Sequence, residues 1–222
     1  MQNKKTIVLL DFCGTLINFQ TFDPYIKKVI LSYAPKRKRW LNCSLILFIS
    51  RIIHHFNKDY YFYKHYLVKL TYGIPETVFQ QIAIQYCDKN LKPNIILETK
   101  DLIQQFREKN YEIIILSGGC DIYIKELTQY FNIKKVIATE ILFKNGKSTG
   151  KIRNDCLGKN KVKLLKAFLG QSYLEQHNII GITDSRSDLP MLDICTKKII
   201  VSHNKHQPWV SADMDEIIWY EH

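Results

Sequence analysis

The sequence lacks paired cysteines. Its six cysteines form no Cys-x-x-Cys pair and have no histidine partner at metal-ligand spacing. In a chain of 222 residues a disulfide framework is therefore not expected, and a structural zinc site still less. Reduced thiols fit a cytoplasmic protein best. The cysteines are Cys13, Cys43, Cys87, Cys120, Cys156 and Cys195.

Long hydrophobic runs are also missing. The N-terminal run 6–10 has five residues and ends at Asp11, which is too short for a signal peptide and typical of a buried strand. The most apolar stretch, residues 40–56, contains Arg51 and is shorter than the roughly 20 residues of a membrane span. A buried helix is the preferred interpretation. A helix lying on a membrane surface, with residues 36–39 as a basic collar, is the alternative.

Acidic residues are scarce in one segment. The formal net charge is +11, and residues 24–92 hold twelve lysines and arginines against three acids. Such a segment favours anionic partners, including the surface of an anionic membrane, although a solvated helical surface explains it equally well. No recognised nucleic-acid motif accompanies the charge, so we expect no specific nucleic-acid partner.

Short apolar strands alternate with helical patterns along much of the chain. The strands are β-branched and show little alternation, which is typical of parallel strands covered on both faces. The sequence therefore predicts an α/β fold, a doubly wound, Rossmann-like and mostly parallel sheet. Expected strands are 6–10, 112–116, 135–138, 179–183 and 198–201, and expected helices are 99–109, 122–131, 159–169 and 189–194.

Two features interrupt this alternation. Asn145-Gly146, between short apolar–polar runs, predicts a two-residue hairpin. About a hundred residues separate the first two strands, and residues 24–92 look helical throughout. We therefore predict an α/β core of residues 1–22 and 94–222, with an inserted helical cap of residues 23–93.

Polar residues follow several of the expected strands. Asp11 ends the first, Ser117-Gly118-Gly119 the second, and Asp184 the fourth, while Lys161 begins the helix ahead of that strand. A lone Asp at a strand end is often only a helix cap. Ligands of open α/β sheets, however, bind outside the carboxyl ends of the strands, so we expect these groups to meet there.

This set of groups suits phosphoryl transfer. A carboxylate such as Asp11 can attack phosphorus, and Asp184 beside it would repel it unless a hard cation lay between them. Mg²⁺ takes oxygen ligands and bridges to phosphate, and Asp188 is placed to order its water shell. Ser117, the following amides and Lys161 would neutralise the phosphoryl oxygens.

The same stretches resemble the haloacid dehalogenase-like (HAD) hydrolases, and among them the phosphoserine-phosphatase-like branch with a helical cap. That branch has an Asp-x-Asp-x-Thr loop, a strand ending in Ser-Gly-Gly, a later Lys, and Gly-Asp-Ser-x-x-Asp. Here these read DFCGTL, IIILSGG, GKNKVKLL and GITDSRSDLPML. The resemblance covers roughly residues 6–20 and 95–205, while the cap matches only in place and length.

The resemblance implies a role for each matching residue. Asp11 would be the nucleophile, and Lys161, with Lys159 as its rival, would hold nucleophile and phosphate. The implied phosphate-binding residues are Thr15, Ser117, Gly118 and Lys161. The implied Mg²⁺ ligands are Asp11, the backbone carbonyl of Cys13, Asp184 and, near the metal, Asp188.

Two positions depart from the family pattern. Thr183 stands where a glycine is usual, and we expect its branched side chain to narrow the loop. Cys13 replaces the acid that protonates the leaving group and then activates water, a contribution typically worth about 10²–10⁴ in rate. A thiol with a pKa of about 8.5 can donate a proton but is a poor base at neutral pH. Simple packing of Cys13 as a small apolar residue is the alternative.

These considerations predict a Mg²⁺-dependent cytoplasmic phosphatase that acts on a small phosphorylated metabolite through an aspartyl-phosphate on Asp11. The alternatives are a phosphotransferase or a phosphonate hydrolase of the same fold. A weakly active protein that binds phosphate and metal, and docks on an anionic surface through its basic cap, is a further alternative. The sequence leaves the substrate and the oligomeric state open.

Overall fold

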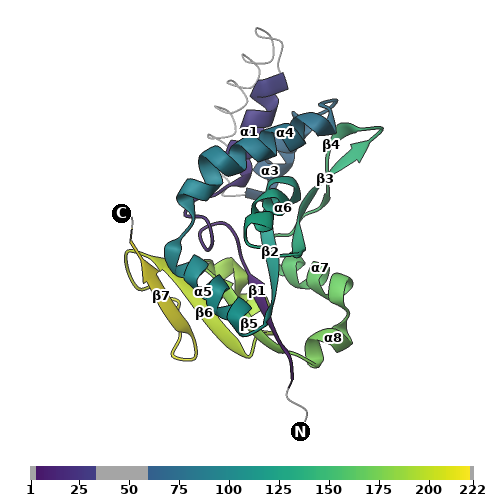
Figure 1. The fold of residues 1–222 in the computed structure, drawn as a ribbon. Coiled ribbons are helices and arrows are strands. Elements are labelled where there is room, and N and C mark those ends of the chain that lie inside the picture. The colour runs from purple at the N-terminus through teal and green to yellow at the C-terminus, as the bar shows by residue number, and fades with distance from the viewer. Residues whose placement is uncertain (1–3, 34–59, 221–222) are drawn as a thin grey trace.

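The protein is built on a seven-stranded sheet in the order β4-β3-β2-β1-β5-β6-β7. The computed structural model describes residues 4–33 and 60–220 (Figure 1). From β3 to β7 neighbouring strands are parallel, and β4 joins β3 in an antiparallel hairpin. The strands are β1 Thr6–Leu10, β2 Glu112–Cys120, β3 Lys135–Lys144, β4 Lys147–Asn154, β5 Asn178–Thr183, β6 Lys197–His203 and β7 Asp215–Trp219.

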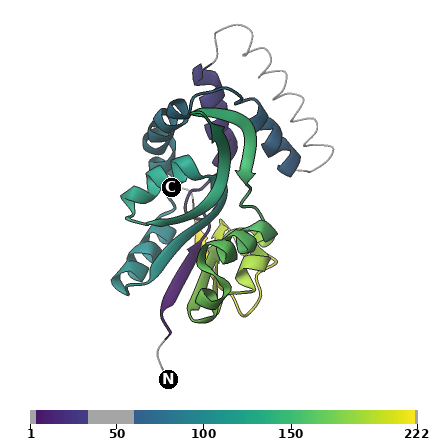
Figure 2. The same ribbon diagram turned by 90° about the vertical axis from the view of Figure 1, so that its right-hand side faces the viewer.

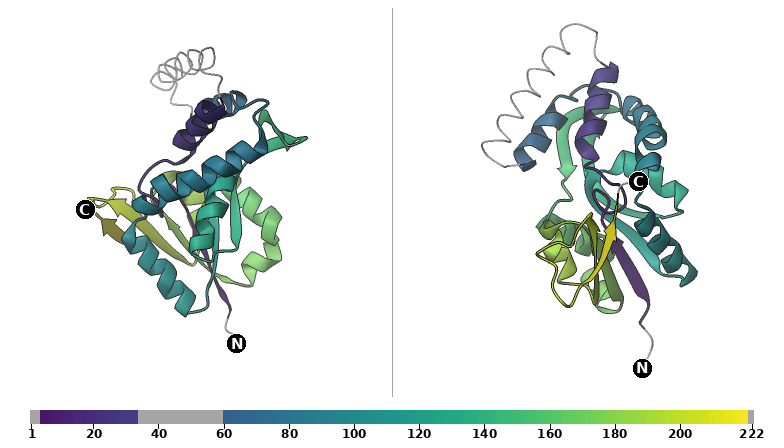
Figure 3. Two further views of the ribbon diagram at one scale, coloured as in Figure 1. Left: turned by 45° about the horizontal axis from the view of Figure 1, so that its top comes forward. Right: turned by 90° about the vertical axis from the view of Figure 1, so that its left-hand side faces the viewer.

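The central strand is buried on both faces, as its continuous apolar sequence predicts. Side chains alternate across a strand, so Val8 and Leu10 enter one hydrophobic core while Ile7 and Leu9 enter the other. Helices cover both faces. The two sets lie on opposite sides of the sheet in the right-hand view of Figure 3. The first core is covered by α5 Leu97–Glu108 and α6 Asp121–Tyr130, and the second by α7 Lys159–Leu169, α8 Gln171–Glu175 and α9 Leu189–Leu192.

The predicted fold class is confirmed, and the differences concern strand ends and two short elements. The strand β2 continues through the Ser117-Gly118-Gly119 turn, with a shift of register between Ser117 and Cys120. The strand β3 runs six residues past its expected end because it forms one arm of the hairpin. Asn145 (φ 51°) and Gly146 (φ 69°) both have positive φ, which the predicted two-residue turn requires. The sequence predicts neither β7 nor α8. The strand β7 (DEIIW) lacks the unbroken β-branched run of β1, and the five residues of α8 are too few to show a helical period.

Helices above the carboxyl ends of the strands form the inserted segment. Within the described residues these helices are α1 Phe22–Tyr33, α3 Tyr60–Lys69 and α4 Glu76–Tyr86, followed by a short π-helix at Cys87–Leu91 and a 3-10 helix at Lys92–Asn94. The β3–β4 hairpin reaches up to these helices (Figure 2). There the ring of Phe143 packs edge-on against the ring of Phe79, with 5.0 Å between the ring centres. The predicted boundary at residues 23–93 stays a prediction. The hairpin nevertheless packs with the insert although it is distant in sequence.

The apolar stretch 40–56 and its basic collar lie outside the described residues. Within the described ranges, no helix combines the length and the apolar character needed to cross a bilayer.

Candidate active site

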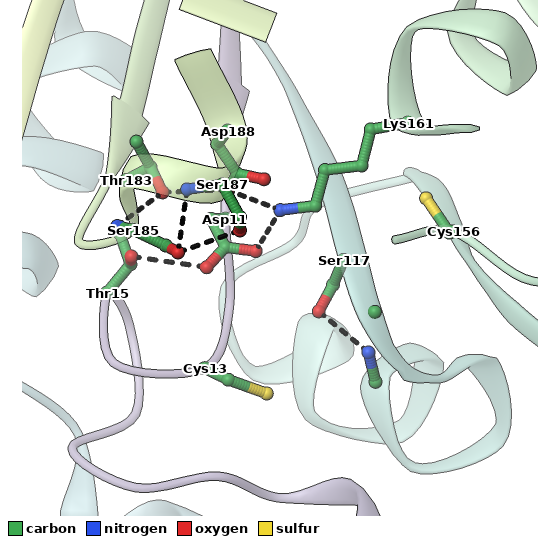
Figure 4. Close-up of polar contacts among 12 residues, drawn as sticks. Asp11, Cys13, Thr15, Ser117, Cys156, Lys161, Thr183, Ser185, Ser187 and Asp188 are labelled. Carbon is green, nitrogen blue, oxygen red and sulfur yellow. Dashed lines mark hydrogen bonds and ion pairs between the residues drawn. The ribbon is translucent and has the colours of Figure 1, made fainter. Parts of the chain in front are cut away.

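Predicted site residues from four separate segments meet at one cavity of about 410 Å³. Asp11 directly follows β1 and Asp184 directly follows β5, while Ser117 lies near the end of β2, which finishes at Cys120. The carboxyl-terminal parts of three strands therefore converge as expected. Lys161 reaches the same place from the first turn of α7. Figure 4 shows Asp11 between Lys161 on one side and Thr15 on the other. The lining also includes Cys13, Gly118, Gly119, Ser185, Ser187 and Asp188.

Lys161 is a buried cation shared by two buried carboxylates. Its Nζ donates to Asp11 Oδ1 at 2.7 Å and to Asp188 Oδ2 at 2.6 Å. Burial alone disfavours an ammonium, but the two carboxylates outweigh it and raise the pKa of Lys161. The lysine is therefore charged, and it fixes one oxygen of Asp11. The rival Lys159 is exposed at the helix start, so the structure favours Lys161.

Asp188 is held by more than the lysine. Its Oδ2 also accepts a hydrogen bond from the Thr183 hydroxyl at 2.7 Å, and that hydroxyl accepts from the Ser185 backbone N–H at 3.1 Å. The expectation that Thr183 merely narrows the loop missed this role, because a hydrogen-bonding partner cannot be read from a side chain's shape. The placement of Asp188 beside a metal stays a prediction, and its observed partner is Lys161.

Thr15 links the two carboxylates at the strand ends. Its hydroxyl accepts from the Asp184 N–H at 2.9 Å and lies 3.1 Å from Asp184 Oδ1 and 3.3 Å from Asp11 Oδ2. The side chain is fully buried. Thr15 therefore positions Asp11 and Asp184, and its predicted contact with phosphate stays a prediction.

Asp184 carries an unfavourable charge. Burial, and next the negative charge of Asp11, raises the pKa of Asp184 to about 7. Burial likewise raises the pKa of Asp11, with the Lys161 ammonium opposing the rise. When both carboxylates are ionised they repel each other. A cation between them would offset this repulsion and the cost of burying the two charges.

The donor set fits a hard cation. Within the described part of the chain, no group of three His, Cys, Asp or Glu side chains is arranged to hold a metal. Two carboxylates, from Asp11 and Asp184, line the cavity, and carboxylate oxygens are among the donors that Mg²⁺ prefers. Gly14 leaves room for this arrangement, since a Cβ at that position would overlap the Asp184 carboxylate.

Cys13 lines the cavity but is a poor base. Its Sγ lies 3.0 Å from the Thr21 hydroxyl, which in turn lies 2.6 Å from the Tyr123 hydroxyl in the core. Burial, reinforced by the charge of Asp11, raises the pKa of Cys13 to about 11. The thiol is therefore neutral at physiological pH, as the sequence suggested. The chain of hydroxyls behind it leads into the core.

Four residues that were not among the predicted site residues also line the cavity. Gln20, Phe22 and Asp23 line it from the segment that enters α1, and Leu157 lines it from the loop before α7. Their signal in the sequence is proximity to a motif, DFCGTL for the first three and Lys161 for Leu157.

Gly14 allows a specific test of this geometry. Gly14 and Gly73 share a φ of +78°, but a Cβ at Gly73 has nothing within 4 Å. We expect Gly14→Ala and Gly73→Ala each to lose about 1–2 kcal/mol of unfolding free energy from backbone strain. Only Gly14→Ala should also displace Asp184, and so lose the thermal stabilisation that added Mg²⁺ gives. Equal responses of the two variants to Mg²⁺ would contradict the assigned place of Asp184.

Comparison with known proteins agrees with this geometry. Residues 8–193 match the family model of haloacid dehalogenase-like hydrolases. A phosphoserine phosphatase from Methanocaldococcus jannaschii is 21% identical over 209 residues, which cover 90% of this chain and 86% of that protein.

Solved structures share the fold. A Bordetella pertussis Tohama I protein of unknown function has a TM-score of 0.76 at 14% identity, covering 90% of this chain and 91% of that one. A substrate-bound phosphoserine phosphatase has a TM-score of 0.60 at 18% identity, covering 90% and 87%. The predicted family resemblance is confirmed. Since the family model spans most of the sequence, this chain belongs to the haloacid dehalogenase-like hydrolases.

Proposed function

We propose that this protein is a Mg²⁺-dependent phosphatase of small phosphorylated metabolites, with Asp11 as its nucleophile. One observation carries the proposal: Asp11 lines the cavity with one oxygen bonded to the Lys161 ammonium, while Asp184 and Ser117 line the same space. Family membership and the likeness to phosphoserine phosphatases support hydrolysis of phosphoric monoesters.

The proposed reaction has two steps. A carboxylate oxygen of Asp11 attacks phosphorus, the bond from phosphorus to the substrate oxygen breaks, and that oxygen takes up a proton as the alcohol leaves. Water then attacks the aspartyl-phosphate, releasing inorganic phosphate, regenerating the carboxylate and giving up a proton. Lys161 holds Asp11 in place and offsets its charge, and Ser117 would donate a hydrogen bond to a phosphoryl oxygen.

Asp11, Asp184 and the backbone carbonyl of Cys13 would hold the metal. Bound there, Mg²⁺ would neutralise charge on the phosphoryl oxygens and remove the repulsion between the two carboxylates.

Cys13 makes both proton transfers difficult. Its neutral thiol is a much weaker general acid than the carboxylic acid it replaces, and in that form it cannot take a proton from water. Substrates whose leaving groups need no proton, such as aryl and acyl phosphates, should therefore be preferred. The same property favours a second candidate function, transfer of the phosphoryl group to an acceptor other than water.

A panel of phosphorylated metabolites tests the proposal. Phosphate release should require Mg²⁺ and should vanish in Asp11→Asn, which keeps the size of the side chain but removes the nucleophilic charge. Activity that persists without Asp11 would sink the proposal. A phosphorylated acceptor in place of free phosphate would instead identify a phosphotransferase.

Cys13→Asp tests the role assigned to the thiol. The substitution supplies an ionisable acid, so turnover of alkyl phosphates should rise by about 10²-fold, the lower end for general acid–base catalysis. Formation of the aspartyl-phosphate from an aryl phosphate needs no proton donor, so the rate of that first step should change little, and it serves as the internal control. If alkyl-phosphate turnover stays the same, Cys13 does not limit proton transfer.

A further inference from the structure

Lys64, in the cap helix α3, is a buried cation that does not line the cavity. Its side chain has no exposed surface, and its Nζ donates to three acceptors. These are the Gly118 carbonyl at 2.7 Å, the Thr139 hydroxyl at 2.7 Å and Asp155 Oδ1 at 2.5 Å. The ammonium also lies 4.7 Å from the centre of the Phe22 ring, a wall of the cavity.

Packing alone does not account for a charge at this position. Removing an ion pair from water costs several kcal/mol, and an apolar pair of the same volume is often as stable or more so. The distinctive feature of Lys64 is its hydrogen bond to the Gly118 carbonyl. One hydrogen of this cap lysine is directed at the backbone of the turn that lines the predicted phosphate site.

The Gly118 carbonyl belongs to the same peptide group as the Gly119 N–H. On the far side of that peptide, the Gly119 N–H donates to Ser117 Oγ at 3.0 Å. A serine hydroxyl that accepts in this way keeps its own hydrogen to donate elsewhere. Ser117 lines the cavity, so that hydrogen can serve a phosphoryl oxygen.

We propose that Lys64 is a positioning residue of the phosphate site: it fixes and polarises the Gly118–Gly119 peptide, so that the Ser117 hydroxyl donates into the cavity. Hydrogen bonds in series strengthen one another, and a cation at the start of the series strengthens all of them. The inference rests on the proposed function, because it takes phosphate to bind beside Ser117.

Thr139 and Asp155 support the same geometry. The Thr139 hydroxyl lies 3.0 Å from the Gly118 carbonyl and 3.1 Å from Asp155 Oδ1, so it touches both ends of the cluster. Asp155 balances the charge of Lys64 and lies in the segment after β4, whereas Lys64 belongs to the cap. The cap is thereby tied to the phosphate-binding turn through the lysine.

A double-mutant cycle separates this role from simple tethering of the cap. The pair Lys64→Met with Asp155→Asn removes both charges and leaves no buried ion unpaired. It is combined with Ser117→Ala, and the dissociation constant of inorganic phosphate is measured calorimetrically in Mg²⁺. With Ser117 present, we expect the pair to weaken binding about tenfold, as for one hydrogen bond to a charged group. With Ser117→Ala, the loss should be below about twofold.

Thr71→Val with Ser148→Ala is the matched control. These two hydroxyls form a buried 2.7 Å hydrogen bond between the insert and the β3–β4 hairpin, away from the phosphate turn. The control should lower the melting temperature without changing phosphate affinity. If the first pair does not fold, Lys64→Gln with Asp155→Asn is a milder replacement. Its loss of phosphate affinity should be smaller and should also depend on Ser117.

The outcomes are distinct. If the Lys64–Asp155 pair of substitutions lowers phosphate affinity equally with and without Ser117, the role of Lys64 is overturned and the proposed phosphate site is not. Failure of the wild-type protein to bind phosphate in Mg²⁺ would overturn both this inference and the proposed function.

Discussion

The charge balance around Lys161 is the constraint on which the site depends. Three buried or nearly buried carboxylates, from Asp11, Asp184 and Asp188, meet at the ends of β1 and β5, and Lys161 is the cation that pairs with two of them. A buried carboxylate without a partner is costly, so the position of α7, which carries the lysine, is tied to both strand ends. Asp184 does not pair with Lys161, so a cation bound beside Asp184 would supply the positive charge that this carboxylate lacks.

Much of the fold could be predicted because its signals are local. Thr6–Leu10 and Lys159–Leu169 have the expected bounds, since an unbroken β-branched run and a helical period persist over enough residues to be distinctive. Asn145-Gly146 located the hairpin because few residues accept positive φ at both turn positions. The place of the hairpin against α3 and α4 was not predictable, because that packing is set by residues far apart in the sequence.

The same distinction applies to the site. Asp11, Lys161 and Asp184 stand at strand or helix ends, and Ser117 lies near the end of β2. Their convergence therefore follows from the topology of a parallel sheet. The positions of the groups that orient these residues cannot be predicted from the topology. These groups act through hydrogen bonds whose partners are brought together only by folding. Thr183 donates to Asp188, Thr15 lies between the carboxylates of Asp11 and Asp184, and Lys64 donates to the Gly118 carbonyl.

The account predicts a working nucleophile combined with slow release of the phosphoryl group. The direct measurement is rapid acid quenching of the protein with Mg²⁺ and an aryl phosphate, followed by mass spectrometry of the intact chain and its peptides. A phosphoryl group should accumulate on Asp11 in the wild-type protein and fall when Cys13 is replaced by Asp. Phosphate release with no phosphoryl group on Asp11, or with the group on another residue, would contradict the account.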